Sequence, residues 1–338
     1  MRVFQIEGDW GFDNLRLAQR PEPKPRRGEV LISMKKASLN ARDLIVPLRG
    51  YGRATGELPL IPISDGVGEV IETGEGVTRV KTGDRVCPTY FQDWIGGDPS
   101  PARFASALGG PLDGVMADLI CLSEQGVVRI PDYLTDAEAA TLPCAALTAW
   151  SAIATHARTR AGDRILIQGT GGVALFALAF AKLHGAHVTV ISSSDDKLDM
   201  VRAMGADATI NYRETEDWAR ASRSITENRG GYDNIIELGG ETTLPLSLRA
   251  VRPGGTISMI GVLSGLNLSA SLGPIVARQV RLQGVTVGHR DGFEAMLAAM
   301  AQHEIRPVLG KSFAFEDLRA ALDHLRSGGS VGKTLIEF

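Results

Sequence analysis

A glycine-rich turn between an apolar strand and an apolar helix is the segment of this chain with the clearest chemical meaning. Residues 165–167 predict a buried strand and residues 173–183 predict a helix. Gly169 and Gly171 lie between them, and Ala174 stands at the third small position of the pattern G-x-G-x-x-G/A. Gly169 permits a tight turn, and Gly171 lets a pyrophosphate approach the backbone where a helix N-terminus favours an anion. We therefore predict a dinucleotide site contacted by Gly169, Thr170, Gly171, Gly172 and Val173.

The next predicted strand, residues 187–191, indicates which nucleotide this site prefers. Sites for NAD place an acidic residue at the tip of this strand, about 20 residues beyond the glycines, to bind the ribose 2′-hydroxyl. Here the tip is Ser192, so a 2′-phosphate meets hydroxyls and a cation rather than a carboxylate. We expect NADPH to be preferred over NADH, in a pocket formed by Ser192, Ser193, Ser194 and Lys197. The alternative is a polar loop in which Asp195 is the N-cap of the following helix.

Composition excludes several classes of protein. The chain has 338 residues, 44% of them hydrophobic and 22% charged, and a formal net charge of −3. No basic tract interleaved with aromatic residues suggests nucleic acid, and no apolar run reaches the roughly 18 residues of a membrane span. The first residues lack the apolar core of a signal peptide. Cys87, Cys121 and Cys144 are scattered and odd in number, which indicates reduced thiols and a cytoplasmic location.

The order of predicted elements divides the chain into three parts of an α/β protein. Residues 1–145 are rich in short strands, glycine and proline, whereas residues 146–287 alternate strands with helices and predict a parallel sheet. In the first part, glycines at residues 66–76 are expected to interrupt a strand. Residues 288–338 predict two helices and a final strand, which are too short to enclose a core. We expect this last part to pack on the first.

Several motifs together resemble one family over essentially the whole chain. The chain is similar to the medium-chain dehydrogenase/reductase superfamily, in particular to its zinc-independent alcohol dehydrogenase and quinone oxidoreductase-like branch. This resemblance implies a GroES-like β-barrel catalytic domain and a doubly wound parallel Rossmann domain, with the active site in the cleft between them. The matching segments are Lys36-Ala-Ser-Leu-Asn-Ala-Arg-Asp43, Pro62-Ile-Ser-Asp-Gly-Val-Gly-Glu-Val70, Thr82-Gly-Asp-Arg-Val86, Leu142-Pro-Cys-Ala-Ala-Leu-Thr-Ala-Trp150, Gly169-Thr-Gly-Gly-Val173, Met204-Gly-Ala206, Arg252-Pro-Gly-Gly255 and Gly332-Lys-Thr334.

The resemblance also bears on the metal. Zinc-dependent members hold a catalytic zinc with Cys, His and a further Cys or acidic ligand. The corresponding positions here are Asn40, Ser64 beside Asp65, and Cys144, and all six histidines lie at or beyond His156. The four-cysteine structural zinc lobe is also absent from the sequence. We predict an enzyme without zinc, in which Cys144 is a small buried residue.

Loss of the metal changes the expected reaction. Hydride addition to a simple ketone concentrates negative charge on oxygen, which zinc stabilises as a Lewis acid. A quinone or an α,β-unsaturated carbonyl disperses that charge itself, so we expect such a small-molecule acceptor. A zinc-free alcohol dehydrogenase or carbonyl reductase is the first alternative. A nucleotide-binding protein without turnover is the second, because a fold does not determine a function.

The resemblance assigns two residues to the acceptor. Asn40 corresponds to a polar residue at the nicotinamide end, whose amide can donate to a substrate oxygen, and Tyr51 to an active-site tyrosine that can donate a hydrogen bond or a proton. The alternative for Asn40 is a turn residue bonded to its own backbone, and for Tyr51 a loop aromatic packed on the barrel. Phe91 and Trp94 either form the wall of the acceptor pocket or pack in the core.

Further cofactor contacts follow from the same resemblance. Lys333 corresponds to a basic residue that reaches the pyrophosphate across the cleft, or else is an exposed lysine on the last strand. The apolar segment 282–288 corresponds to a strand that pairs between subunits, which predicts a homodimer. The remaining predicted contacts are Thr148 near the nicotinamide, Tyr212 near the adenine or the 2′-phosphate, and Gly239, Gly261 and Val262 at strand ends.

Overall fold

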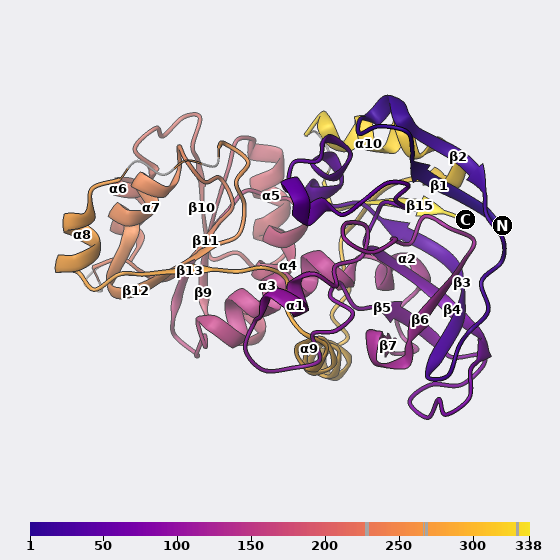
Figure 1. Ribbon diagram of the computed structural model, residues 1–338. Coiled ribbons are helices and arrows are strands. Elements are labelled where there is room, and N and C mark those ends of the chain that lie inside the picture. The colour runs from indigo at the N-terminus through magenta and orange to yellow at the C-terminus, as the bar shows by residue number, and fades with distance from the viewer. Residues whose placement is uncertain (227–229, 266, 268–269, 329–330) are drawn as a thin grey trace. The chain divides into compact units, whose positions relative to one another are not determined.

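The chain divides into two compact units in the computed structural model (Figure 1). The structure describes residues 1–226, 230–265, 267, 270–328 and 331–338. Unit 1 comprises Met1–Leu147 and Val287–Phe338, and unit 2 comprises Thr148–Thr286. These boundaries lie within two residues of those expected from the sequence. The C-terminal segment contributes to the core of unit 1, because it is too short to bury its apolar residues alone.

Unit 1 is built on a mainly antiparallel sheet of seven strands, with order β14-β15-β3-β4-β5-β7 and β6 paired to β3. A separate two-stranded sheet pairs β1 with β2. The C-terminal strand β15 lies between β14 and β3, so segments from both ends of the sequence of unit 1 share the larger sheet, although β1 and β2 do not belong to it. The strands are β1 (Arg2–Ile6), β2 (Leu15–Gln19), β3 (Glu29–Ser38), β4 (Asp65–Thr73), β5 (Arg85–Pro88), β6 (Leu119–Ser123), β7 (Val127–Arg129), β14 (Leu309–Ala314) and β15 (Lys333–Glu337).

Strand β4 is continuous through Gly66 and Gly68, which corrects the expectation that these glycines interrupt it, whereas Gly74 and Gly76 follow the end of the strand, where a turn was expected. Gly68 lies opposite Met34 on β3, and a Cβ atom there would lie 2.5 Å from both Ile32 Cγ2 and Ser33 O. At Gly66 a Cβ atom would lie 2.6 Å from Met34 Cε. Gly66 and Gly68 therefore permit a close approach of two strands rather than a turn.

The helices of unit 1 are short apart from two in the C-terminal segment. They are α1 (Pro101–Phe104), α2 (Asp136–Ala139), α9 (Arg290–His303) and α10 (Leu318–Arg326). The sequence correctly predicted the last two helices but not β14, because most of its side chains are exposed and it lacks a clear apolar alternation. Phe315, just before α10, packs on Phe4 and Phe338 with ring centroids 5.3 Å and 4.9 Å away. This contact fixes the C-terminal segment on the first strand.

Unit 2 is a six-stranded parallel sheet of order β10-β9-β8-β11-β12-β13. Chain order reverses between β8 and β11, so the carboxyl ends of these two strands form the switch point at which doubly wound sheets bind ligands. The apolar centres of β8 and β11 are fully buried, as expected for strands covered on both faces. The strands are β8 (Arg164–Gln168), β9 (His187–Ser192), β10 (Ala208–Asn211), β11 (Tyr232–Glu237), β12 (Val251–Met259) and β13 (Arg281–Gly284).

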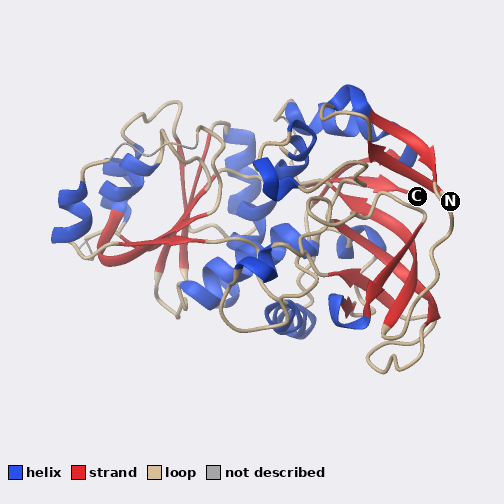
Figure 2. Ribbon diagram, viewed as in Figure 1, coloured by secondary structure: helices blue, strands red, loops and turns tan. Residues whose placement is uncertain are grey.

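Helices cover both faces of this sheet. Figures 1 and 2 show α4 and α5 on one side of the strands and α6 and α7 on the other. Helix α3 (Leu147–Trp150) begins at the boundary between the units and continues a turn of π-helix, Leu142–Ala146. The remaining helices are α4 (Gly172–Leu183), α5 (Asp195–Ala203), α6 (Trp218–Ile225), α7 (Leu244–Ala250) and α8 (Leu272–Ala277).

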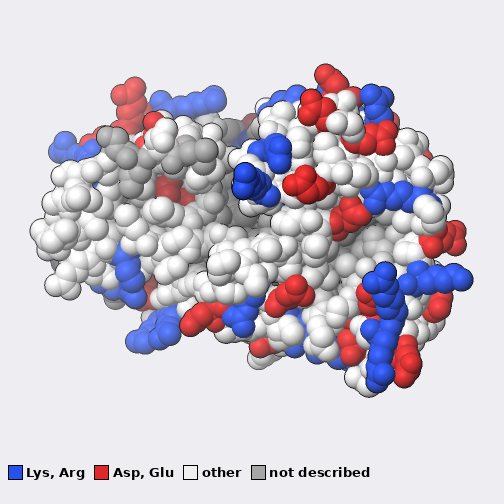
Figure 3. All heavy atoms as spheres, in the orientation of Figure 1, with Lys and Arg blue, Asp and Glu red and all other residues white. Residues whose placement is uncertain are grey.

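Neither the helices nor the surface shown has the features of a membrane span or a basic stripe. Among the described residues, no helix is both long and apolar enough to cross a bilayer. Acidic and basic side chains are interspersed on the face drawn in Figure 3.

Candidate nucleotide and acceptor sites

The glycine turn lies at the carboxyl end of β8, next to the switch point of unit 2. Gly169 has a φ of 76°, a left-handed conformation that favours glycine, and its N–H donates to Ile191 O at 2.7 Å. The turn ends at Gly171, the N-cap residue of the twelve-residue helix α4. A Cβ atom on either glycine would have no atom within 4 Å, so there is open space beside both residues.

The N-terminus of α4 has the features of an anion site. No side chain in the described part of the chain caps it, so the amides of its first turn remain available as donors. The rest of the helix is apolar, with Leu175, Ala177 and Leu178 buried, and it packs against β8 and β9. A pyrophosphate fits this arrangement of open backbone, free donors and helix dipole.

The tip of β9 has the serines that the sequence placed there. Ser192 is the last residue of the strand and is buried, and Ser193, Ser194 and Lys197 are partly exposed. The N-cap of α5 is Ser194, not Asp195, which corrects the predicted alternative. Asp195 instead begins the helix, where its Oδ1 accepts from Asn211 Nδ2 at 3.0 Å. This carboxylate is therefore engaged with the neighbouring strand.

A buried carboxylate that the sequence reading missed organises the other strand of the switch point. Glu237, at the end of β11, is 1% exposed. Its Oε1 accepts from the N–H groups of Gly239 and Gly240, both at 3.0 Å, and its Oε2 accepts from Gln168 Nε2 at 2.7 Å. The hydroxyls of Thr243 and Ser247 also donate to Glu237. This network joins the end of β8 to the loop after β11.

The other residues predicted to contact the cofactor have varied environments. Packing restricts the positions of Gly239 and Gly261 to glycine, since added Cβ atoms would meet Thr243 Oγ1 and Leu238 O, and their contacts with a cofactor stay a prediction. Thr148, the first residue of unit 2, and Thr170 in the glycine turn are buried. Tyr212 and Val262 are exposed, at 41% and 47%.

A second group of polar residues gathers in unit 1 where β3 ends. Asn40 precedes a 3₁₀ turn, Ala41–Leu44, and its backbone N–H donates to Asp43 Oδ2 at 2.7 Å. Lys333, the first residue of β15, is 4% exposed, and its Nζ donates to Leu39 O at 2.6 Å and to Asn40 Oδ1 at 2.5 Å. This position contradicts the alternative of an exposed lysine, because the ammonium is held by oxygens of unit 1. The contact of Lys333 with a pyrophosphate stays a prediction.

Charged and aromatic groups surround this cluster. Arg42 is buried, donates from Nη1 to Leu108 O at 2.8 Å and lies over the ring of Tyr90. Burial raises the pKa of Asp43 to about 6, against the opposing effect of the Arg42 guanidinium. Burial also raises the pKa of Tyr51, which is close enough to Arg42 and Asp43 to interact electrostatically. Tyr51 therefore retains its phenolic proton at neutral pH.

Unsatisfied polar atoms are concentrated in the same place. In the described part of the chain, ten buried side-chain nitrogen or oxygen atoms lack a hydrogen-bond partner. Five of them are on β3, on the turn after it, or on the paired strand β15. Because folded proteins leave few such atoms, this concentration indicates a place where a polar ligand or water binds. The five are Ser38 Oγ, Asn40 Nδ2, Arg42 Nε, Asp43 Oδ1 and Thr334 Oγ1.

The residues at the expected zinc position do not fit a zinc ion. Both oxygens of Asp65 are engaged, since Oδ1 accepts from Ser64 Oγ at 2.7 Å and Oδ2 from Cys144 N at 3.0 Å. Burial and the charge of Asp65 raise the pKa of the Cys144 thiol above its ordinary value. Asn40 Oδ1 accepts from the Lys333 ammonium. Among the described residues, no three His, Cys, Asp or Glu side chains converge as potential metal ligands.

Two aromatic residues considered for the acceptor pocket pack in the core of unit 1. Phe91 and Trp94 are buried, with ring centroids 5.6 Å apart, and both contact Phe104. The Trp94 ring also contacts His289, which caps α9 by accepting the Gly292 N–H at 2.9 Å. The core-packing alternative therefore accounts for Phe91 and Trp94.

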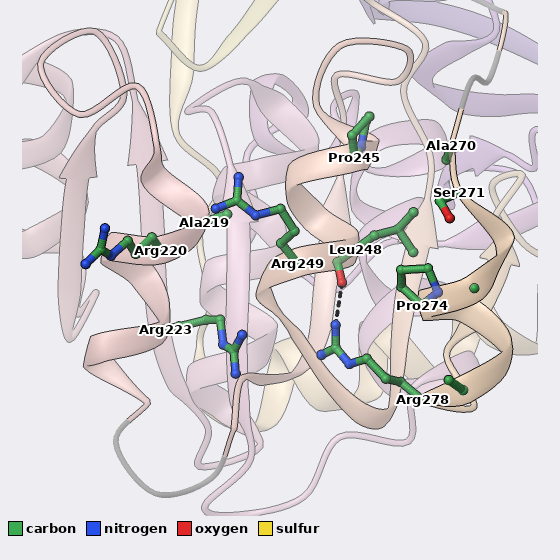
Figure 4. Close-up of a pocket in the computed structure, with 12 residues that line it drawn as sticks. Ala219, Arg220, Arg223, Pro245, Leu248, Arg249, Ala270, Ser271, Pro274 and Arg278 are labelled. Carbon is green, nitrogen blue, oxygen red and sulfur yellow. Dashed lines mark hydrogen bonds between the residues drawn. The ribbon is translucent and has the colours of Figure 1, made fainter.

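A cavity of about 720 Å³ lies among α6, α7 and α8 (Figure 4). Its lining includes Arg220, Arg223, Arg249 and Arg278. Arg278 donates to Leu248 O at 2.8 Å, and Arg249 pairs with Asp217 at 2.7 Å. None of the residues predicted to bind the cofactor or the acceptor lines this cavity.

Comparison with known proteins identifies the class to which this fold and site belong. Residues 26–132 match the alcohol dehydrogenase GroES-like domain, and residues 172–302 match the zinc-binding dehydrogenase family. The chain belongs to the medium-chain dehydrogenase/reductase superfamily and is an oxidoreductase of this nicotinamide-dependent family. Unit 1 is thus GroES-like and unit 2 is Rossmann-like, as the sequence predicted.

Individual relatives extend over the whole chain. A zinc-type alcohol dehydrogenase-like protein from Schizosaccharomyces pombe is 39% identical, over 97% of this chain and 96% of that protein. The crystal structure of a putative alcohol dehydrogenase from Sinorhizobium meliloti has a TM-score of 0.93 and 41% identity, covering 100% of this chain and 98% of that one. A quinone oxidoreductase from Coxiella burnetii has a TM-score of 0.80 and 25% identity, covering 100% and 99%.

The Glu237 network yields a prediction about nucleotide binding. In Glu237→Gln, an NH₂ group replaces one carboxylate oxygen. The NH₂ group cannot accept hydrogen bonds, so the loop at Gly239 and Gly240 loses part of its support. We expect NADPH affinity to fall about tenfold and stability by about 1–3 kcal/mol. Nucleotide fluorescence titration and urea unfolding measure the two effects. The exposed Glu241→Gln in the same loop is the control, and equal losses in both variants would contradict the prediction.

Asp43 yields a prediction about pH. The pKa of Asp43 in the folded protein, about 6, lies above the ordinary aspartate value. Protonation of Asp43 therefore favours the folded state, and this contribution is fully present below about pH 4. That contribution is lost as pH rises through about 6. Relative to Asp43→Asn, the free energy of unfolding of the unmodified protein should fall by roughly 2 kcal/mol between about pH 4 and pH 7. Urea unfolding across this range tests the difference, and parallel pH profiles would refute it.

Proposed function

We propose that this protein is a zinc-independent, NADPH-dependent reductase of quinones or α,β-unsaturated carbonyl compounds. The observation that carries the proposal is the group of hydrogen-bond donors in unit 1. There the amide of Asn40 stands at the expected position of a zinc ligand and accepts a hydrogen bond from the buried ammonium of Lys333. The likeness to a quinone oxidoreductase is consistent with this acceptor class.

The donor set constrains the acceptor through the charge that forms during reduction. NADPH, when bound, supplies a hydride. The chain must then stabilise negative charge on the acceptor oxygen with hydrogen bonds alone, because its residues do not fit a Lewis-acidic metal. A conjugated acceptor disperses this charge over several atoms and needs less stabilisation than a simple ketone.

Two residues are positioned to act on the acceptor oxygen. Asn40 Nδ2 is a buried donor without a partner, which an acceptor carbonyl can satisfy. Tyr51 is 46% exposed and keeps its phenolic proton at neutral pH, so it can donate that proton or a hydrogen bond. In unit 2, the glycine turn and the serines at the tip of β9 bind the phosphates of the nucleotide and orient it.

The second candidate is a zinc-free alcohol dehydrogenase or carbonyl reductase. Its support is that relatives over the full length of the chain have names of alcohol dehydrogenases. The same donors would then stabilise an alkoxide, whose charge is concentrated on one oxygen. The two candidates differ in whether the acceptor must be conjugated.

A substrate panel after chelation tests the function and the metal together. We expect the chelator-treated protein, free of zinc by elemental analysis, to oxidise NADPH with quinones or enones at least about tenfold faster than with saturated ketones. Saturated ketones as the better acceptors would support the second candidate. Tight NADPH binding without turnover of any acceptor would indicate a nucleotide-binding protein, and stoichiometric zinc retained through chelation would refute the metal-free proposal.

Ser192 tests the nucleotide preference. In Ser192→Asp, the carboxylate repels a 2′-phosphate but can accept from a 2′-hydroxyl, so NADPH affinity should fall at least tenfold more than NADH affinity. Comparing the dissociation constants of both nucleotides in one variant cancels any general loss of stability. The control is Ser224→Asp, on the exposed surface of α6. Equal weakening of both nucleotides by Ser192→Asp would show that Ser192 does not contact the phosphate.

We also propose a cytoplasmic homodimer. Strand β13 is an edge of the unit 2 sheet. The apolar segment 282–288, which includes most of β13, can pair along this edge with the same segment of a second copy. All three cysteines are free, which suits a reducing compartment.

A further inference from the structure

The buried ammonium of Lys333 has a local role in unit 1. Lys333 is the first residue of β15 and extends toward the end of β3. The two segments are joined there by a backbone hydrogen bond, in which Leu39 N–H donates to Thr334 O at 2.9 Å. Its Nζ makes both of its described hydrogen bonds to neutral oxygens, the backbone carbonyl of Leu39 and the side-chain amide of Asn40. Burying a cation is costly, so these two acceptors must hold it in a defined position.

This contact determines the orientation of the Asn40 amide. An ammonium group can only donate, so the oxygen of the amide must face Lys333 and the NH₂ group must face away. The Asn40 backbone N–H is already bonded to Asp43, which fixes the base of the side chain. The outcome is that Asn40 Nδ2 is left as a buried donor without a partner.

We propose that Lys333 is a positioning residue that fixes Asn40 with its Nδ2 directed at the oxygen of the acceptor, and that its charge strengthens this donor. The inference rests on the proposed function, in which Asn40 contacts the acceptor. Withdrawal of electron density from Oδ1 by the ammonium makes the Nδ2 hydrogens more positive, an effect of linked hydrogen bonds.

Lys333 and Asn40 would stabilise the reaction most at the stage when negative charge forms on the acceptor oxygen. A hydride leaves C4 of the nicotinamide and bonds to the acceptor carbon, and the π electrons of the acceptor move to its oxygen. That oxygen then carries negative charge until a proton from Tyr51 or water neutralises the product. A donor backed by a buried cation stabilises this stage more than the neutral substrate, which is the requirement for a faster reaction.

The proposal and the pyrophosphate role inferred from resemblance predict different consequences for Lys333→Met. If Lys333 acts through Asn40, kcat at saturating NADPH should fall about a hundredfold, as for loss of an oxyanion donor, while the NADPH dissociation constant changes less than twofold. A pyrophosphate contact predicts the reverse, with weaker NADPH binding and little change in kcat. That second pattern would overturn the proposal.

A double-mutant cycle tests whether Lys333 acts through Asn40. We expect Asn40→Ala and Lys333→Met each to lower kcat about a hundredfold, and the double variant to lose little more than either alone. Independent, multiplying losses would overturn the proposal. Lys36→Met is the matched control, because Lys36 lies on the paired strand β3 but makes a surface ion pair with Glu337 at 2.9 Å.

A second variant keeps the test decisive if Lys333→Met does not fold. Asn40→Asp retains an oxygen for the Lys333 ammonium, and so supports the buried charge, but it removes the N–H donor. We expect this variant to fold, to bind NADPH as the unmodified protein does, and to lose about a hundredfold in kcat. Retention of kcat would overturn the proposal.

The outcome for Lys333 is separable from that of the proposed function. All rates are measured with the best acceptor found in the substrate panel. If that acceptor is a saturated ketone, the proposed acceptor class fails, but the same losses in Lys333→Met and Asn40→Asp still support the role of Lys333. Absence of turnover with every acceptor would overturn both.

Discussion

The hydrogen bond between the Lys333 ammonium and the Asn40 amide is the constraint on which the proposed acceptor site depends. It joins the first residue of the last strand to the end of β3, in the part of unit 1 where unsatisfied polar atoms are most concentrated. A cation at this depth is tolerated only while its acceptors remain in place. The same contact engages the amide oxygen at the expected position of a metal ligand and leaves the amide nitrogen for another partner.

The proposed nucleotide site of unit 2 is organised by a similar principle. Glu237 is buried at the end of β11 and receives hydrogen bonds from backbone and side-chain donors, one of them Gln168 at the end of β8. The two strands of the switch point are thus joined by polar side chains beneath the loops that would contact a nucleotide. In both units, a buried polar side chain holds loop residues in a fixed geometry, as a binding site requires.

Features that depend on local patterns could be predicted from the sequence. The apolar runs of β8 and α4 and the glycines between them specify a buried strand, a helix and the turn that joins them, because periodicity and backbone freedom are properties of neighbouring residues. Strand β14 was missed because its exposed side chains give no alternation, and Gly68 was misinterpreted because it adjoins another strand. Partners remote in the chain could not be predicted. The position of Lys333 against Asn40 and the buried state of Arg42 and Glu237 depend on tertiary contacts, although a carboxylate that ends an apolar strand is itself a signal.

The order of strands in unit 1 affects how the protein can be made. Strand β15 lies in the middle of its sheet, between β14 and β3, although it is the last segment of the chain. During synthesis the whole of unit 2 leaves the ribosome before β15 does, so unit 2 can fold while the sheet of unit 1 still lacks an internal strand. Until then residues 36–38 of β3 lack the partner that β15 provides, and an unpaired strand edge is prone to aggregation. Synthesis of β15 is therefore the step that completes the sheet of unit 1, and a nascent chain stalled before β15 would leave this part of β3 without its partner.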